Sequence, residues 1–135
     1  MDALKKFFQN DQFAARNDIR LVAVSPGHAT AEMPLHPYHW NGIQNVQGGA
    51  IFTLADFAFA AASNSHGTVA VAVNVSITFM KAAKEGTLHA EARESTRNHR
   101  LGSYSVEVKD DAGDLVAIFQ GLAYRKQETI PEALG

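Results

Sequence analysis

Hydrophobic and polar residues follow two different periods along this chain of 135 residues. In residues 1–16 apolar side chains, Phe13 among them, recur near the spacing of an amphipathic helix, so we predict one or two short helices there. From residue 19 the pattern alternates as in a strand, over residues 19–23 and again over residues 30–35. The Ser-Pro-Gly-His sequence between these two segments is typical of a turn, which predicts a hairpin.

A long apolar segment, GGAIFTLADFAFAAAS, follows a loop rich in glycine, proline and asparagine. Its composition predicts a helix from residue 48 to about residue 65, where His66 and Gly67 end it. Asp56 is its only charged residue, whereas a helix at a protein surface carries a polar stripe. We therefore expect this helix to be enclosed on most sides.

Four strand-like segments follow, over residues 69–79, 88–94, 103–109 and 115–124. Strict alternation in the first of them would place Ala72 and Asn74 together on the face opposite its valines. The order of elements predicts an α+β fold, a single domain over residues 1–135, with an antiparallel sheet of about six strands wrapped around one long helix and a short N-terminal helix before it. Because one helix leaves apolar surface uncovered, we expect a dimer or a larger assembly.

Composition excludes several classes of protein. The chain is 46% hydrophobic and 19% charged with a formal net charge of -2, which is typical of a soluble globular protein and gives no basic surface for nucleic acid. It contains no cysteine, so disulfides, thiolate nucleophiles and thiolate metal sites are absent. No segment has the apolar length of a signal peptide or of a membrane span, and we expect a cytoplasmic protein without a membrane partner.

The lone carboxylate of the apolar helix is the first candidate for chemistry. Burying an unpaired carboxylate costs several kcal/mol, so Asp56 is either satisfied by a neighbouring polar group or retained for a function. Gly48 and Gly49 start the same helix, and their backbone N–H groups lie at its positive end, although a glycine pair also allows a tight turn. A carboxylate base or nucleophile together with an oxyanion stabiliser are the two parts that acyl transfer requires.

The spacing of these two parts limits how they can act together. Gly48 and Asp56 are eight positions apart, about 12 Å along a helix at 1.5 Å per residue. Both groups must lie within about 3.5 Å of one reacting carbonyl group. One helix therefore cannot supply both, but two helices packed antiparallel across a two-fold axis can, with the amide from one subunit and the carboxylate from the other.

The sequence resembles the hotdog-fold acyl-CoA thioesterases, in particular the phenylacetate-degradation (PaaI-like) group. The resemblance implies a hotdog fold, hydrolysis of a small, medium or arylacetyl acyl-CoA without a cofactor, and a homodimer or a homotetramer built as a dimer of dimers, with acyl-CoA bound at the dimer interface. It covers nearly the whole chain and rests on the loop asparagine of WNG, the Gly-Gly helix start, and the segments IFTLADFAFAAASNSHG, VNVSITFMKAAKEG and GDLVAIFQGLAYRK.

Carried over by position, Asp56 resembles the catalytic carboxylate of that family, acting as general base or as nucleophile. Gly48 resembles the residue whose backbone N–H polarises the thioester carbonyl, and Asn41 resembles the asparagine that positions the thioester or water, although WNG also reads as an ordinary turn. Many relatives have histidine where this chain has Gln47, which cannot titrate near neutral pH. We assign the remaining candidates to substrate binding: Gln47, Gly49 and Asn74, the last as a substitute for a relative's hydroxyl residue aligned with Ala72.

Other readings of the sequence remain open or are disfavoured. The six histidines lack the spacing of a metal site, so we expect no metal and no cofactor. Aromatic residues that can line an acyl pocket are Tyr38, Trp40 and Phe59, and cations near strand ends that we read as solvated surface are Lys81, Lys84, Arg97 and Arg100. The alternatives to a thioesterase are an acyl-CoA hydratase or dehydratase, which usually needs an Asp-His pair, and a non-catalytic acyl-CoA-binding protein.

Overall fold

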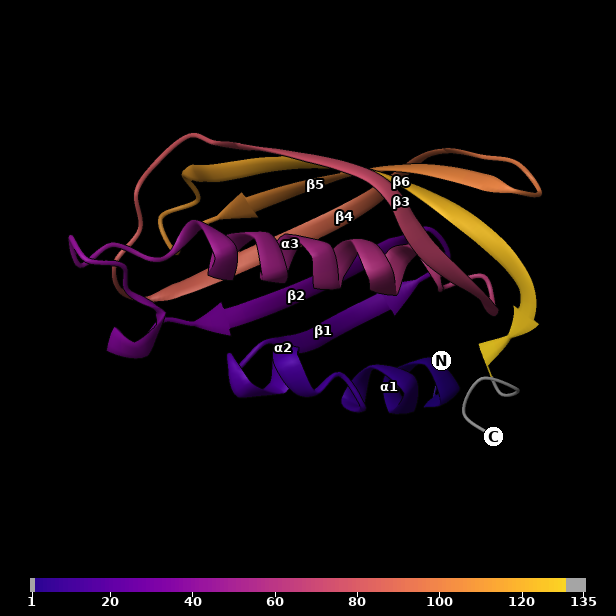
Figure 1. Ribbon diagram of the computed structural model, residues 1–135, viewed down its shortest axis with the longest axis horizontal. Coiled ribbons are helices and arrows are strands. Elements are labelled where there is room, and N and C mark those ends of the chain that lie inside the picture. The colour runs from indigo at the N-terminus through magenta and orange to yellow at the C-terminus, as the bar shows by residue number, and fades with distance from the viewer. Residues whose placement is uncertain (1, 131–135) are drawn as a thin grey trace.

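A six-stranded antiparallel sheet and a long helix form the frame of the molecule (Figure 1). The structure is a computed structural model that describes residues 2–130, so Met1 and residues 131–135 of the predicted domain lie outside it. The sheet order is β1-β2-β4-β5-β6-β3. The helices are α1 (Asp2–Gln9), α2 (Gln12–Arg16), the 3-10 turn η1 (Pro37–His39) and α3 (Gly48–Ser63). The strands are β1 (Arg20–Ser25), β2 (His28–Pro34), β3 (Thr68–Phe79), β4 (Thr87–Arg97), β5 (Leu101–Lys109) and β6 (Leu115–Thr129).

Helix α3 runs along one face of the curved sheet, and the core lies between them (Figure 1). Leu54 and Phe59 from the helix are fully buried, as are Val106 and Phe119 from the sheet. Phe59 packs so closely against β6 that a Cβ on Gly121 would lie 2.8 Å from its ring, which explains a glycine inside that strand. The prediction of about six strands around one long helix is confirmed, and Phe59 belongs to the core.

The prediction that α3 is enclosed on most sides is confirmed, with one partly open stripe as the exception. Gly49 is exposed, and Thr53, Asp56 and Ala60 are only partly buried. These residues recur every three or four positions and therefore share one side of the helix. In a single subunit, α3 thus has a partly open stripe with the carboxylate in its middle, while its other residues are mostly buried.

Strict alternation along β3 fails, because the strand contains a bulge. Ala72 pairs with Ala123, but Asn74 pairs with the preceding residue of β6, Leu122, so Val73 is an extra residue between the two pairs. Paired residues share a face and successive residues do not. Asn74 therefore lies on the opposite face of the sheet from Ala72, and the notion that the two share a face was wrong.

Strand β3 is an edge of the sheet, since it pairs only with β6. Its free edge carries exposed apolar side chains, with Val71 40% and Val73 54% accessible. The opposite edge, β1, lies beside α1 and α2 (Figure 1). An uncovered apolar edge is a template for pairing with another chain, and β3 is the strand that offers it.

The N-terminal segment forms the two short helices that the sequence predicts. Leu4 and Phe8 are buried, and Phe8 meets Phe57 of α3 edge-to-face at 5.4 Å between ring centroids. The side chain of Asp11 caps α2 by accepting a 3.0 Å hydrogen bond from the Ala14 amide. Phe13 does not follow the predicted apolar face, because its side chain is 66% exposed.

Asn64 ties the end of α3 to the start of β3, and its removal gives a stability prediction. The buried side chain donates to the carbonyl groups of Ala60 (2.8 Å) and Ala70 (3.1 Å) and accepts from the Ala70 amide (2.9 Å), and the two bonds to Ala70 are fully buried. We expect Asn64→Ala to lower the free energy of unfolding by about 2 to 4 kcal/mol, because buried backbone groups lose their partners. Urea unfolding at fixed protein concentration measures this, and Asn10→Ala, at an exposed position, should change it by less than about 0.5 kcal/mol.

Candidate functional site

The N-terminus of α3 presents free hydrogen-bond donors. Its N-cap residue, Gln47, makes no side-chain cap, and the Gln47 carbonyl accepts from the amides of Ala50 (3.0 Å) and Ile51 (3.2 Å). Within residues 2–130 the amides of Gly48 and Gly49 have no acceptor. A Cβ on Gly49 would meet nothing within 4 Å, so the space beside this turn is open. The positive end of the helix thus offers two unused N–H groups to an incoming oxygen atom.

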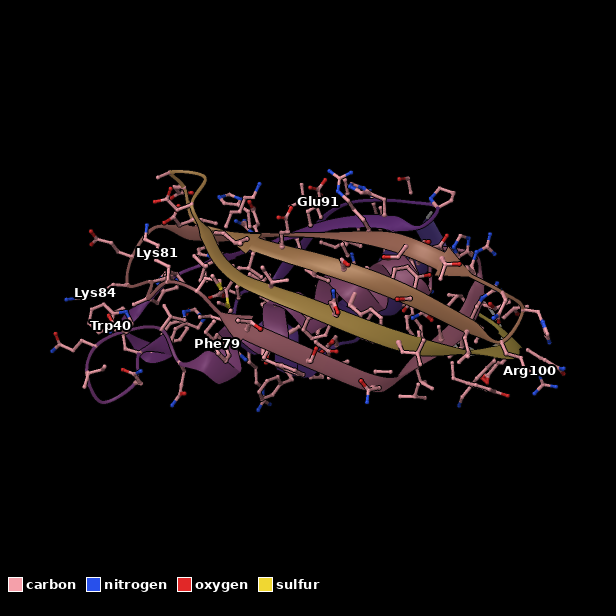
Figure 2. The ribbon with its side chains drawn as sticks, turned by 90° about the horizontal axis from the view of Figure 1, so that it is seen from above. Trp40, Phe79, Lys81, Lys84, Glu91 and Arg100 are labelled. Carbon is pink, nitrogen blue, oxygen red and sulfur yellow. The ribbon has the colours of Figure 1, made fainter. Side chains whose placement is uncertain are left out.

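One side of this turn is closed by the end of β3. A Cβ on Gly48 would lie 3.1 Å from the ring of Phe79, which places that ring against the helix start. Figure 2 shows Phe79, Trp40 and Lys84 at the same end of the molecule. The helix start therefore lies next to the free edge strand, where a second chain can reach it.

Asp56 is a partly buried carboxylate without a partner. Within the described residues its side chain makes no hydrogen bond and no ion pair. Burial raises the pKa of the Asp56 carboxyl above its usual range, and the nearby charge of Asp11 raises that pKa further. A carboxylate that is desolvated and unpaired is more basic than one in water and is available to remove a proton or to attack a carbonyl group.

The two ends of the candidate site are apart within one subunit. Gly49 and Asp56 lie on the same side of α3 but about two turns apart, a distance of about 10 Å at 1.5 Å per residue. Between them, the Thr53 hydroxyl donates to the Gly49 carbonyl at 2.7 Å. One subunit therefore cannot bring both groups to one carbonyl group, and the prediction of a second subunit stands.

Asn41 belongs to a tight loop, and its side chain holds the turn. Its side-chain oxygen accepts from the amides of Ile43 (3.0 Å) and Asn45 (3.2 Å), which is the ordinary turn that WNG also predicts. The side-chain nitrogen has no partner among the described residues and remains a free donor. The loop is fixed to its surroundings by the amides of Val46 and Gln47, which donate to Ala83 and His39 at 2.8 Å.

A cavity of about 430 Å³ lies over the first turns of α3. Gln47 and Gly49, two of the predicted substrate-binding residues, line it, whereas Asn74 on β3 does not. Of the predicted aromatic candidates only Tyr38 lines it, because Trp40 anchors a loop by donating to the Lys84 carbonyl at 2.8 Å. The residues around this cavity are Phe13, Asn17, Tyr38, His39, Gln47, Gly49, Ala50 and Thr53.

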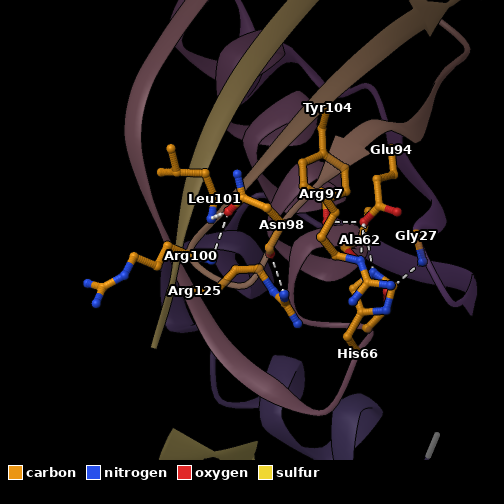
Figure 3. A network of polar contacts seen from close by, with 11 residues as sticks. Gly27, Ala62, His66, Glu94, Arg97, Asn98, Arg100, Leu101, Tyr104 and Arg125 are labelled. Carbon is orange, nitrogen blue, oxygen red and sulfur yellow. Dashed lines mark hydrogen bonds and ion pairs between the residues drawn. The ribbon is translucent and has the colours of Figure 1, made fainter. Parts of the chain in front are cut away.

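The six histidines are distributed over separate polar contacts, none of which includes Asp56. Glu94 is the centre of one such network, in which Tyr104 and His66 hydrogen-bond to it at 2.7 and 2.8 Å and Arg97 lies 3.4 Å away (Figure 3). Burial raises the pKa of Glu94, but the bonds from Tyr104 and His66 outweigh it and leave the pKa lowered. Other histidines contact Glu91 (His28), Asp18 (His36), the Asn17 carbonyl (His39), Asp111 (His89) and Arg100 (His99).

The two lysines near strand ends, which we read from the sequence as solvated surface, have partners within the chain. Lys81 binds Asp110 and Asp114 at 2.7 Å each, and these hydrogen bonds raise the pKa of Lys81 to about 12. Lys84 lies over the Trp40 ring at 5.3 Å. In residues 2–130 no three histidine or acidic side chains gather as metal ligands. Across the same residues, every helix is too short or too polar to span a bilayer.

Comparisons with known proteins identify related chains. Residues 44–117 match the Thioesterase superfamily. An Archaeoglobus fulgidus protein, provisionally named as an esterase, is 44% identical over 92% of this chain and 81% of its own length. The acyl-coenzyme A thioesterase PaaI of Escherichia coli is 35% identical over 91% of this chain and 89% of its own.

The solved structures lead to the same group of proteins. The structure of the E. coli PaaI protein from the phenylacetic acid degradation operon superposes with a TM-score of 0.91. It is 32% identical and covers 95% of this chain and 94% of its own. The predicted hotdog fold, with its antiparallel sheet around a long helix, is thereby confirmed. Gly48 and Asp56 lie inside the matched residues 44–117, whereas Phe13, Tyr38 and Asn41 precede them.

Proposed function

The chain belongs to the thioesterase superfamily and is a thioester hydrolase, and we propose that its substrate is an acyl-CoA with a small, medium or arylacetyl acyl group. The products are then the free acid and CoA. The similarity to an acyl-coenzyme A thioesterase supports the CoA substrate. One observation carries the proposal. Helix α3 has two unused amides at its positive end and, about two turns further along, a carboxylate without a partner.

The reaction follows from these two groups. The Gly48 amide donates to the thioester oxygen and stabilises the negative charge that develops on it. Asp56 either removes a proton from a water molecule that attacks the carbonyl carbon, or attacks that carbon itself and is released by water. Collapse of the tetrahedral intermediate breaks the C–S bond, and the CoA thiolate leaves and takes up a proton. The free side-chain nitrogen of Asn41 positions the thioester or the water.

The active site in this proposal needs a homodimer, alone or within a homotetramer. Two copies that pair along the free edge of β3 would bury the exposed Val71 and Val73 and bring their α3 helices side by side. In an antiparallel arrangement, the Gly48 amide of one subunit meets Asp56 of the other. This pairing bridges the separation of about 12 Å between the two groups in one subunit.

A product assay with a panel of acyl-CoA esters tests the proposed function. We expect release of free thiol, with one equivalent of acid for each CoA, and no requirement for added metal or cofactor. A hydratase would instead convert an enoyl-CoA to its hydroxyacyl-CoA without releasing thiol, and a binding protein would retain ligand without turnover. Either of these two results would contradict the proposal. Within one subunit, no histidine of residues 2–130 contacts Asp56.

A further inference from the structure

We propose that the cavity over the first turns of α3 receives the acyl part of the substrate, and that Phe13 and Tyr38 are the residues that select for bulky acyl groups. This inference rests on the proposed function, because it takes the thioester oxygen to lie at the α3 amides. The cavity adjoins those amides, since Gly49 and Gln47 are part of its wall. One of the two substituents of the carbonyl carbon can then lie in it.

The chemistry of the wall favours the acyl group over the CoA arm. Three polar side chains of the cavity already have partners within the protein. His39 accepts from the His36 amide at 3.0 Å and contacts the Asn17 carbonyl at 2.9 Å, the Asn17 amide group donates to the Phe13 carbonyl, and Thr53 donates to Gly49. Among the polar side chains of the wall, Gln47 alone has no partner in residues 2–130, so few donors remain for the amides and hydroxyl of a pantetheine arm and the cavity suits an apolar group.

Two aromatic side chains at the rim supply the apolar contact. Phe13 is 66% exposed and Tyr38 is 63% exposed. Tyr38 is held in place because its ring stacks on His36 at 5.0 Å and its hydroxyl donates to Asp18. Large rings left open to solvent beside a cavity of about 430 Å³ are suited to cover a bulky ligand.

The positions of Phe13 and Tyr38 along the sequence support a role in substrate selectivity. Gly48 and Asp56 lie within the residues that match the thioesterase superfamily, but Phe13 comes from α2 and Tyr38 from η1, which precede that match. In this division, α3 carries the reacting groups, while the N-terminal segment and η1 shape the space for the acyl group. Selectivity can then change without altering the catalytic helix.

Truncation of the two rings tests the proposal. We expect Phe13→Ala and Tyr38→Ala each to lower kcat/KM for phenylacetyl-CoA about tenfold and to change kcat/KM for acetyl-CoA by less than about twofold. Tyr38→Phe, which keeps the ring, should retain the preference. Val22→Ala removes a side chain that is 54% exposed on β1, outside this cavity, and should leave both substrates unaffected.

A second variant fills the cavity instead of opening it. Ala50→Leu enlarges a side chain of the cavity wall and should reduce turnover of phenylacetyl-CoA far more than that of acetyl-CoA. Equal losses for both substrates would show that the cavity holds the common CoA arm and would overturn the proposal. Unchanged kinetics, or a wild-type preference for acetyl-CoA over phenylacetyl-CoA, would overturn it as well. Failure of the proposed function is a separate result, in which the wild-type protein hydrolyses neither ester.

Discussion

Replacing Asp56 by asparagine is expected to reduce kcat for acyl-CoA hydrolysis by about 10³-fold or more, because the amide can neither accept a proton nor attack the carbonyl group. Asparagine keeps the size of the side chain, so the fold should persist. The pKa of Asp56 is raised in the folded chain, which means that its ionisation weakens folding. Stability is lost as the pH rises from the unfolded pKa through the higher folded pKa, so at pH 7 the variant should be at least as stable as the wild type.

Asp11 offers a matched control for the loss of a negative charge in the same region. Its carboxylate raises the pKa of Asp56 and caps α2, and asparagine caps a helix equally well. Asp11→Asn should therefore retain hydrolysis. Because Asp56 must be ionised to act, kcat/KM falls on the acid side through the pKa of Asp56, and this limb should move to lower pH in Asp11→Asn. Activity of Asp56→Asn within tenfold of the wild type would rule out the proposed mechanism.

The sequence predicted the fold because its signals are local. An uninterrupted apolar helix and several alternating segments determine the helix and the sheet that encloses it, and the structure agrees with both. The bulge at Val73 was not predicted, since nothing in an alternating segment marks an inserted residue. As a result, Asn74 lies on the other face from Ala72, and its assignment to substrate binding lost the reason that supported it.

Sequence spacing alone could relate only those candidate groups that lie on one element. Asp56, Gly48 and Gly49 belong to a single helix, so their spacing could be read from the sequence. Asp11 and Phe13 contribute through tertiary packing of α2 near α3, which sequence spacing does not encode. The exposure of the Phe13 side chain is the signal that it lines the cavity. That exposure becomes visible only when α2 is placed against its neighbours.

The α3 amide is tested by a substitution that removes an N–H group without disturbing the helix. Gly48 is the first residue of α3, where proline is well tolerated, and Gln47 has φ -56° and ψ 133°, which suits the residue before a proline. We expect Gly48→Pro to lower kcat about 10²-fold or more, because one oxyanion donor is lost. Gly48→Ala is the matched control, since it adds the same Cβ beside Phe79, keeps the amide and should be at least about tenfold more active than Gly48→Pro.

Mixing the two inactive variants shows whether amide and carboxylate come from different subunits. When Asp56→Asn and Gly48→Pro chains are co-refolded in equal amounts, a site is intact only if its amide comes from the first variant and its carboxylate from the second. Random assembly makes this true for about one quarter of the sites, in a dimer or in a dimer of dimers. Specific activity should therefore recover to about one quarter of the wild-type value. If both groups acted within one chain, no combination would restore a site, and activity would stay at the level of the separate variants.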